Sequence, residues 1–280
     1  AWGALPVPAS HSSPMTLLAL DPASALIGLH RREHEHDAPA SPSIPRRVMQ
    51  YWDRNPPVQI QTLIDRTRSV CTDLGVEHVL FDDARARAFL VERFDADIVR
   101  AYDTAVHPAM KCDVFRLAYL HASGGHYIDA DIVLRPKPGR MFELPGQLLV
   151  YQWDSKGLSN LCNWLIGASA GDPTLAYALR STAHNVVTCC ERDPQAALKN
   201  ILGVSGPGIF TRGVATHLEV RRKVDDGHAG QVRVEAVSTA HQFIQLGPAY
   251  LKAALDYKDK GDARHWLAAG SGPASGTSEP

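Results

Sequence analysis

Apolar and polar residues follow the pattern of an α/β protein between residues 46 and 237. Short apolar runs, which predict strands, alternate with stretches in which apolar residues recur every three to four positions, which predict helices. The predicted strands are 46–52, 76–82, 126–134, 147–153, 161–169 and 231–237, and the predicted helices are 58–75, 83–94, 107–125, 172–191 and 205–220. This alternation favours a mostly parallel central sheet that is flanked by helices and joined by right-handed crossovers.

The ends of the chain differ in composition from its middle. The chain has 280 residues, which suits one large α/β domain, and we place that domain at 44–267. Residues 1–43 are expected to be a flexible leader and linker, and 268–280 a flexible tail. A metal site at His34 and His36 is an alternative, but the polar, proline-rich composition around them favours a solvated linker.

Composition and charge narrow the range of partners. The formal net charge is -1, so nothing indicates a nucleic-acid partner. No apolar run is long enough to span a bilayer, so we expect no transmembrane span. The five cysteines form no CxxC pair, which favours a reducing compartment over a disulfide framework. We therefore expect a cytoplasmic protein, and leave open a peripheral position at the inner face of a membrane.

Two aspartates follow the apolar stretch at the end of the third predicted strand. Asp129 and Asp131 are two residues apart, so on an extended chain their side chains share a face. Two adjacent carboxylates repel each other, and a divalent cation removes that conflict. Mg²⁺ and Mn²⁺ often bind through one or two carboxylates together with substrate phosphates. The pair therefore predicts a Mn²⁺ or Mg²⁺ site for a phosphorylated substrate; the alternative is two exposed aspartates at a strand end.

A charged pair precedes the aspartates on a predicted helix. Asp113 and Arg116 are three residues apart and therefore share one helical face. They either form an ion pair within the helix or offer hydrogen-bond partners to a polyhydroxylated ligand. Gly124 and Gly125 then allow a tight turn into the strand that carries the aspartates.

The stretch DVFRLAYLHASGGHYIDAD, residues 113–131, resembles the DxD-containing retaining glycosyltransferases of family 32. That family includes α-mannosyltransferases and bacterial capsular-polysaccharide enzymes, and the clostridial glucosylating toxins share the same arrangement. Three further segments are similar to family motifs: IPRRVMQYWDRNPP at 44–57, VSGPGIFTR at 204–212 and ARHWLAAGS at 263–271. The resemblance covers residues 44–270.

The resemblance implies a GT-A fold, a UDP- or GDP-sugar donor and a Mn²⁺ or Mg²⁺ ion. The expected acceptor is a glycan, a lipid-linked glycan or a protein, and the alanine- and arginine-rich composition with an odd number of cysteines favours a bacterial enzyme of polysaccharide biosynthesis. The resemblance also implies roles for individual residues. Asp129 and Asp131 would hold the metal and the diphosphate, with His265 as a late ligand; Asp113 and Arg116 would contact the donor sugar; Trp52 would stack on the base, with Tyr127 near the nucleotide.

Some of the predicted donor-site residues have a structural alternative. Trp52 ends a strand, where an aromatic side chain often belongs to the core. Asn163 either binds a substrate or acts as a capping amide. Gly206 is first of all a turn former beside Pro207, with a second role near the diphosphate, and Gly125 is included among the donor-binding positions.

The stereochemistry of the reaction and two alternative functions also follow from the sequence. Double displacement with retention needs a carboxylate on the far face of the sugar, and the sequence identifies none; the resemblance implies front-face attack instead. YIDADIVL at 127–134 also fits haloacid-dehalogenase-type phosphatases, with Asp129 as nucleophile, although that motif normally opens its domain. The third reading is a sugar- or nucleotide-binding module without catalysis, which an intact DxD and an intact Asp113–Arg116 pair argue against.

Overall fold

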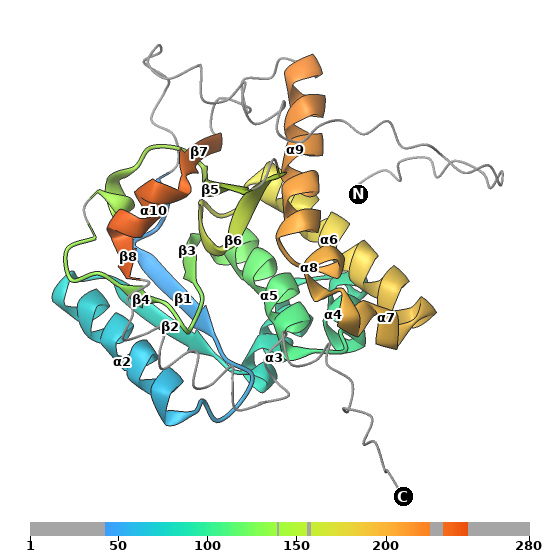
Figure 1. The fold of residues 1–280 in the computed structure, drawn as a ribbon, viewed down its shortest axis with the longest axis horizontal. Helices are drawn as coiled ribbons and strands as arrows, with labels where there is room; N and C mark the ends of the chain where they lie inside the picture. The colour runs from blue at the N-terminus through green and yellow to red at the C-terminus, as the bar shows by residue number, and fades with distance from the viewer. Residues whose placement is uncertain (1–42, 139, 156–157, 225–231, 246–280) are drawn as a thin grey trace, which may run out of the picture.

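The computed structural model describes residues 43–138, 140–155, 158–224 and 232–245. Six strands form one sheet in the order β2–β1–β3–β6–β5–β7 (Figure 1). Their bounds are Arg47–Tyr51 (β1), Glu77–Phe81 (β2), Gly125–Ile128 (β3), Leu148–Ser155 (β5), Leu158–Ala168 (β6) and Val232–Ala236 (β7). A second, two-stranded sheet pairs β4 (Val133–Leu134) with β8 (Ile244–Gln245). The predicted α/β fold with a central sheet is confirmed.

One strand of the large sheet, β6, runs against all the others. Three of its five neighbouring pairs are parallel, namely β1–β2, β1–β3 and β5–β7. Strand β6 runs antiparallel to both of its neighbours, β3 and β5. The sheet is therefore mixed, and β6 brings its middle residues to the end of β3 from the opposite direction.

Helices lie on both faces of the sheet. They are α2 (Val58–Asp73), α3 (Asp83–Arg93), α4 (Ala96–Thr104), α5 (Pro108–Ser123), α6 (Pro173–Arg192), α7 (Pro194–Lys199), α8 (Ile201–Val204), α9 (Pro207–Val224) and α10 (Val237–Phe243), with a 3-10 turn at Met141–Glu143. The five predicted helices correspond to α2, α3, α5, α6 and α9. Among the described residues, none of these helices is long and apolar enough to cross a membrane.

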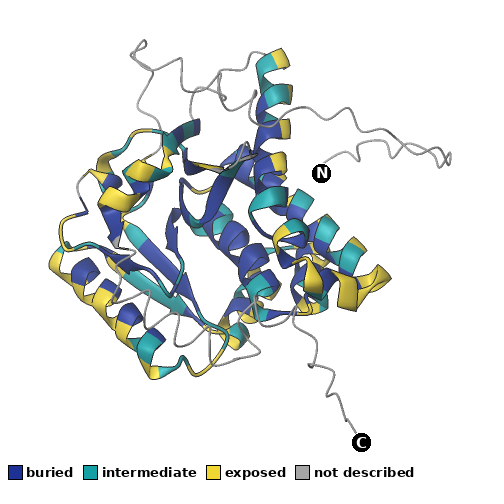
Figure 2. Ribbon diagram, viewed as in Figure 1, coloured by how far each residue is buried: buried dark blue, intermediate teal, exposed yellow. Residues whose placement is uncertain are grey.

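Two buried clusters divide the helices between the faces. One cluster joins α3, α4, α5, α6 and α9 to one face of the sheet. The other joins α2 and α10 to the opposite face. Figure 2 shows the outer side of α2 as exposed, whereas ten residues of α5 are buried. Helix α5 is thus largely an interior helix, and its charged residues Asp113 and Arg116 lie inside the protein.

Local signals fix both ends of α5. The Nδ1 atom of His107 accepts a hydrogen bond from the backbone N–H of Ala109 at 3.1 Å, and Pro108 occupies the first helical position, where a missing N–H costs nothing. Gly124 ends the helix with φ +67°, and Gly125 follows with φ +108°. Both values lie in the left-handed region that favours glycine. The predicted Gly-Gly turn between α5 and β3 is confirmed.

The predicted strand 126–134 is broken in its middle. Strand β3 ends at Ile128, and the chain resumes as β4 only at Val133, in the other sheet. The intervening residues form a turn, closed by a hydrogen bond from the N–H of Ile132 to the carbonyl of Asp129 at 3.1 Å. The prediction that Asp129 and Asp131 share one face of an extended strand is therefore wrong.

Candidate functional site

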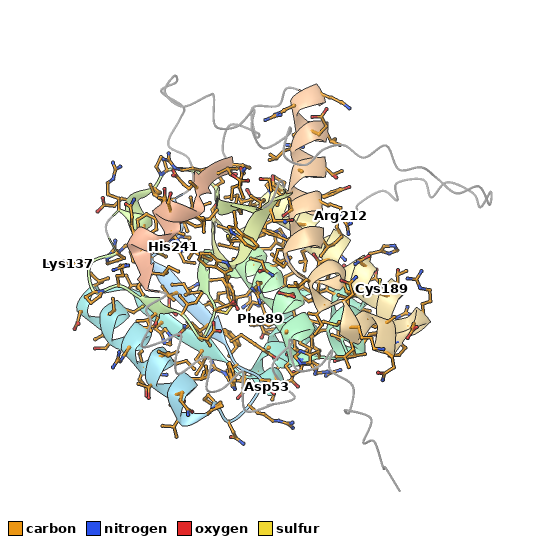
Figure 3. The ribbon with its side chains drawn as sticks, in the orientation of Figure 1. Asp53, Phe89, Lys137, Cys189, Arg212 and His241 are labelled. Atoms are coloured by element: carbon orange, nitrogen blue, oxygen red, sulfur yellow. The ribbon has the colours of Figure 1, made fainter. Side chains whose placement is uncertain are left out.

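A cavity of about 280 Å³ opens where β1 and β3 end. Ligands of α/β sheets collect at this edge, outside the carboxyl ends of the parallel strands. The wall is formed by Tyr51, Trp52, Asp53, Pro108, Ala109, Cys112, Asp113, Arg116, Tyr127, Asp129, Ala130, Asp131, Asn163, Trp164, Ile201, Leu202, Gly206 and Pro207. Figure 3 labels one of them, Asp53, just beyond β1. Eight of the nine predicted site residues that the structure describes are thus brought together.

Asp113 is held by three side chains, which come from α5, from β6 and from the turn between α8 and α9. Its Oδ1 accepts a hydrogen bond from Asn163 Nδ2 at 2.9 Å and lies 3.0 Å from Arg116 Nη2. Its Oδ2 accepts from Ser205 Oγ at 2.6 Å. The side chain is only 6% exposed. Burial raises the pKa of this carboxyl group, while Arg116 and Ser205 act to lower it.

Arg116 lies between two carboxylates. Its Nη2 lies 3.0 Å from Asp113, and its Nη1 lies 3.2 Å from Asp129 Oδ1 and donates to the carbonyl of Asn163 at 2.5 Å. The guanidinium also stacks over the Tyr127 ring, 4.3 Å from the ring centroid. Burial acts to lower the pKa of Arg116, but the surrounding acidic groups raise it, so this side chain stays cationic. The predicted Asp113–Arg116 pair is an ion pair, and it is also part of the cavity wall.

The turn that carries the two aspartates is fixed by its backbone. The N–H of Asp129 donates to the carbonyl of Trp164 on β6 at 3.0 Å. Between the two aspartates, Ala130 is 4% exposed and belongs to a buried cluster with α2 residues, among them Ile60 and Ile64. The middle residue of the DxD turn therefore packs into the protein interior while it also borders the cavity, and both aspartates line the cavity without an extended strand.

Tyr127 and Cys112 form the floor beside Asp129. The Tyr127 hydroxyl donates a short hydrogen bond to Asp129 Oδ1, and it lies 3.1 Å from Cys112 Sγ. Burial raises the pKa of Tyr127 well above its ordinary value. It also raises the pKa of the Cys112 thiol to about 12. Both groups are therefore protonated near neutral pH, and Tyr127 acts as a hydrogen-bond donor rather than an anion.

Trp52 follows the last residue of β1 and contributes to the cavity wall. Its backbone N–H donates to the carbonyl of Phe81 at 2.9 Å, which ties it to the end of β2. The indole is half-buried and packs on the cluster that contains Ala130 and Val133. Trp52 thus contacts the core and lines the cavity, and base stacking stays a prediction.

The structure separates one predicted donor-binding residue from the others. Gly125 starts β3, opposite Ala168, and is absent from the cavity wall. A Cβ atom at Gly125 would lie 3.0 Å from the carbonyl oxygen of Arg47, so close backbone packing requires glycine there. Gly206 does line the cavity, and its Cβ position is 3.0 Å from Leu202. The predicted ligand His265, and the alternative pair His34 and His36, lie outside the described residues.

Sequence reasoning missed several residues of the site. Ser205 binds Asp113, and its position directly before the Gly-Pro turn was the available signal. Cys112 precedes Asp113 and accepts a hydrogen bond from Arg116 Nε to its carbonyl at 3.3 Å. The apolar walls from α5 and α8, such as Pro108 and Leu202, carried no signal of their own.

The donor set fits a hard divalent cation only in part. No group of three or more histidine, cysteine, aspartate or glutamate side chains comes together within the described residues. Asp129 and Asp131 supply two carboxylates to the cavity. Mg²⁺ characteristically binds through one or two carboxylates and completes its shell with water and substrate phosphates. The two aspartates therefore suffice for a metal that arrives with a phosphorylated ligand.

Comparison with known sequences agrees with the DxD turn. Residues 57–144 match the family described as glycosyltransferase sugar-binding region containing DXD motif. A curated relative is the uncharacterized glycosyltransferase L373 of Acanthamoeba polyphaga mimivirus, which is 29% identical over 107 residues. This match covers 38% of the chain and 42% of the relative, so it spans less than half of either protein.

Among solved structures, the chain is similar to the PaToxG glycosyltransferase, with a TM-score of 0.45 and 14% identity over 89% of this chain and 95% of that one. It is also similar to the glycosyltransferase domain of the YGT toxin, with a TM-score of 0.43 and 9% identity over 74% of this chain and 81% of that one. The family match is the more informative finding, since it contains α2, α5, β3 and both aspartates of the turn. The sequence comparisons support a glycosyltransferase of the DXD-containing type.

Proposed function

We propose that this chain is a metal-dependent glycosyltransferase of family 32 with a GT-A fold, which transfers a sugar from a UDP- or GDP-sugar donor. One observation carries the proposal: Asp113, Arg116, Asp129 and Asp131 line one cavity, although they come from an interior helix and a separate turn. A buried network of charged groups is costly unless it is well paired. Its position at the ligand-binding edge of the sheet supports a binding role.

In this proposal Asp129 and Asp131 hold Mn²⁺ or Mg²⁺, and His265 is a further ligand. When bound, the metal supplies positive charge beside the leaving diphosphate. Trp52 stacks on the base, and Tyr127, Asn163 and Gly206 lie around the donor. Asp113 and Arg116 hold the sugar hydroxyls and orient the anomeric carbon toward the acceptor.

We also propose retention of anomeric configuration by front-face attack. Both oxygens of Asp113 are already hydrogen-bonded or ion-paired, and Asp129 Oδ1 is engaged by Tyr127 and Arg116. A carboxylate with occupied oxygens is a poor nucleophile, because attack requires it to leave its hydrogen-bond donors. The pairing of both its oxygens argues against a covalent glycosyl intermediate at Asp113.

The acceptor in this proposal is a glycan, a lipid-linked glycan or a protein, in bacterial polysaccharide biosynthesis. A cytoplasmic location forms part of the same proposal. It is supported by the cysteines: all five are free thiols, four of them buried. Disulfide-free cysteines are typical of reducing compartments.

The test is a panel of UDP- and GDP-sugars with Mn²⁺, read out as nucleotide release with and without a chelator. We expect release from one donor that stops when the metal is removed. Asp131→Asn should lower turnover by at least about 10²-fold, on the scale of a lost electrostatic contact. Asp73→Asn, at an exposed position at the end of α2, is the control. Binding of nucleotide-sugar without any turnover, on any acceptor tested, would favour the non-catalytic module instead.

A further inference from the structure

A buried glutamine on strand β1 contacts the backbone of the DxD turn. Gln50 lies in β1, is 0% exposed, and donates a hydrogen bond from Nε2 to the carbonyl of Asp129 at 3.2 Å. Gln50 lies on a strand that pairs with β3 but is separated from Asp129 by 79 positions in the chain. A buried amide is stable only when its polar atoms are paired. Gln50 therefore uses an amide N–H to bind the backbone of the proposed metal ligand.

The other half of the Gln50 amide is held by a histidine from the edge strand. His78 Nε2 lies 2.9 Å from Gln50 Oε1. A carbonyl oxygen only accepts, so the Asp129 contact requires the Gln50 NH₂ group to face Asp129 and its oxygen to face His78. The His78 Nε2–H is then the donor. The contact selects one orientation of the Gln50 amide, and that orientation is the one that reaches the turn.

The surroundings of His78 keep its ring neutral. Burial lowers the pKa of His78 to about 4, with Arg68 acting in the same direction and Asp65 in the opposite one. A neutral imidazole has one donor and one acceptor nitrogen, and the hydrogen bond to Gln50 fixes which nitrogen carries the proton. Each hydrogen bond in this series therefore has a defined donor: His78 on β2 donates to Gln50 on β1, and Gln50 donates to the carbonyl of Asp129 in the turn.

We propose that Gln50, oriented by His78, is a positioning residue for the DxD turn. Two contacts hold the turn: the N–H of Asp129 donates to the carbonyl of Trp164 on β6, and the side chain of Ala130 packs in the cluster with α2. The carbonyl of Asp129 also accepts from the N–H of Ile132 within the turn, and Gln50 adds a second hydrogen bond to that carbonyl from the sheet. Without Gln50, the peptide between Asp129 and Ala130 keeps only the bond within the turn, which lets the turn shift relative to the sheet and moves both carboxylates. This inference rests on the proposed metal-dependent function.

The proposal can be tested by Mn²⁺ binding to the full chain, measured by electron paramagnetic resonance with Mn²⁺ alone and with Mn²⁺ plus UDP or GDP. Gln50→Met removes the amide with little change in size. We expect it to weaken Mn²⁺ binding by about 10-fold or more, the scale known for residues that orient metal ligands. His78→Leu should weaken binding less, because Gln50 remains but its amide is no longer oriented. His78→Gln keeps an N–H donor and should restore most of the affinity.

A core variant of the same strand separates positioning from stability. Val48 is fully buried two residues before Gln50 and makes no polar contact with the turn. Val48→Ala should lower the melting temperature and leave Mn²⁺ affinity unchanged. If Gln50→Met and His78→Leu bind Mn²⁺ as Val48→Ala does, the positioning role is overturned while the proposed function stands. If Gln50→Met does not fold, the His78 pair of variants decides. Absence of Mn²⁺ binding by the wild type, both alone and with UDP or GDP present, would overturn the metal-dependent function and this inference with it.

Discussion

At the scale of single residues, Arg116 has the most constrained position in the site. It is the cation shared by Asp113 and Asp129, and its side chain is 6% exposed. Removal of one partner of a buried ion pair leaves an uncompensated charge, which typically costs about 3–5 kcal/mol. We expect Arg116→Ala to lower the free energy of unfolding on that scale, measured by denaturant titration, and to abolish donor turnover. Arg116→Lys should recover stability better than turnover, because lysine supplies charge without the planar fork.

A double variant distinguishes two roles for Arg116: neutralising Asp113 and binding the donor sugar. If the cation serves only to neutralise Asp113, then Arg116→Met with Asp113→Asn should restore both stability and activity. If Asp113 and Arg116 hold the donor sugar, as proposed, this double variant regains stability alone. Affinity for free UDP or GDP should change little in either variant, because the pair is assigned to the sugar.

Trp52 is the second residue whose role is tested by comparing stability with affinity. Stacking on a base is worth about 1–3 kcal/mol, so Trp52→Ala should weaken nucleotide binding by about 10- to 100-fold. Trp52→Phe should recover part of the affinity through its smaller ring. Calorimetric titration and thermal unfolding are measured on the same samples. A large fall in melting temperature with unchanged affinity of the folded fraction would assign Trp52 to the core cluster with Ala130 and Leu80 only.

At the scale of elements, the Gly-Gly turn joins the helix of the ion pair to the strand that leads to the DxD turn. Gly124 has φ +67°, and a Cβ atom there would lie 2.9 Å from Ala170 N and from Pro45. Gly75, which follows α2, has φ +61° with nothing within 4 Å of its Cβ position. A left-handed residue other than glycine costs about 1–2 kcal/mol. We expect Gly75→Ala to cost about that much, and Gly124→Ala clearly more because of the added clash. Equal losses for the two variants in denaturant titrations would contradict this reading.

Elements with strong periodicity were predictable, and those defined by tertiary contacts were not. Helix α5 and strand β1 were recognisable from apolar spacing together with Pro108 and Gly124. Helix α4 was missed, although Asp95 caps it by accepting from the N–H of Ile98 at 3.4 Å, because the helix is short and follows α3 closely. The break after Ile128 had no local signal. It arises where Ala130 enters the cluster on α2, a contact between segments far apart in sequence.

The same division applies to the site. Asp113, Arg116 and the two aspartates were predicted, because charged residues in an otherwise apolar stretch stand out. Two contacts depended on how α5, the end of β3 and the turn between α8 and α9 come together: the pairing of Arg116 with Asp129, and the hydrogen bond from Ser205 to Asp113. Gly125 was predicted to bind the donor, but it is the first residue of the four-residue strand β3, whereas the cavity lies at the other end of that strand.

At the scale of the whole molecule, buried neutral histidines predict loss of stability in acid. His126 is 1% exposed, and neither ring nitrogen has a hydrogen-bond partner within the described part of the chain. Burial lowers the pKa of His126 to about 3, with Arg46 as a smaller cause. The unfolded chain binds a proton below its ordinary pKa of about 6.5, whereas the folded protein does not until about pH 3. The free energy of unfolding is therefore unaffected by this group above pH 6.5. As the pH is lowered from 6.5 toward 3, this group lowers the free energy of unfolding by at most about 1.4 kcal/mol per pH unit.

His126→Leu removes that group and should flatten the dependence of the unfolding free energy on pH between 6.5 and 3. The slope is the measurement rather than the absolute stability, since the imidazole packs tightly on Gly167 and leucine has a different shape. His184→Leu is the control, because that side chain is exposed on α6. An unchanged slope for His126→Leu would show that the ring is protonated, or hydrogen-bonded through water, in the folded protein.

The inward position of Ala130 has a consequence for how the site tolerates sequence change. The side chain of Ala130 is 4% exposed and clusters with Ile60 and Ile64. Substitutions at the middle position of the DxD triplet are therefore limited by size and polarity, as in a hydrophobic core. Overpacking such a position displaces the backbone on either side of it, and here both flanking residues are the acids. A library that randomises position 130 would therefore recover small apolar side chains, and compensating changes would map to α2 rather than to the ligand-binding wall.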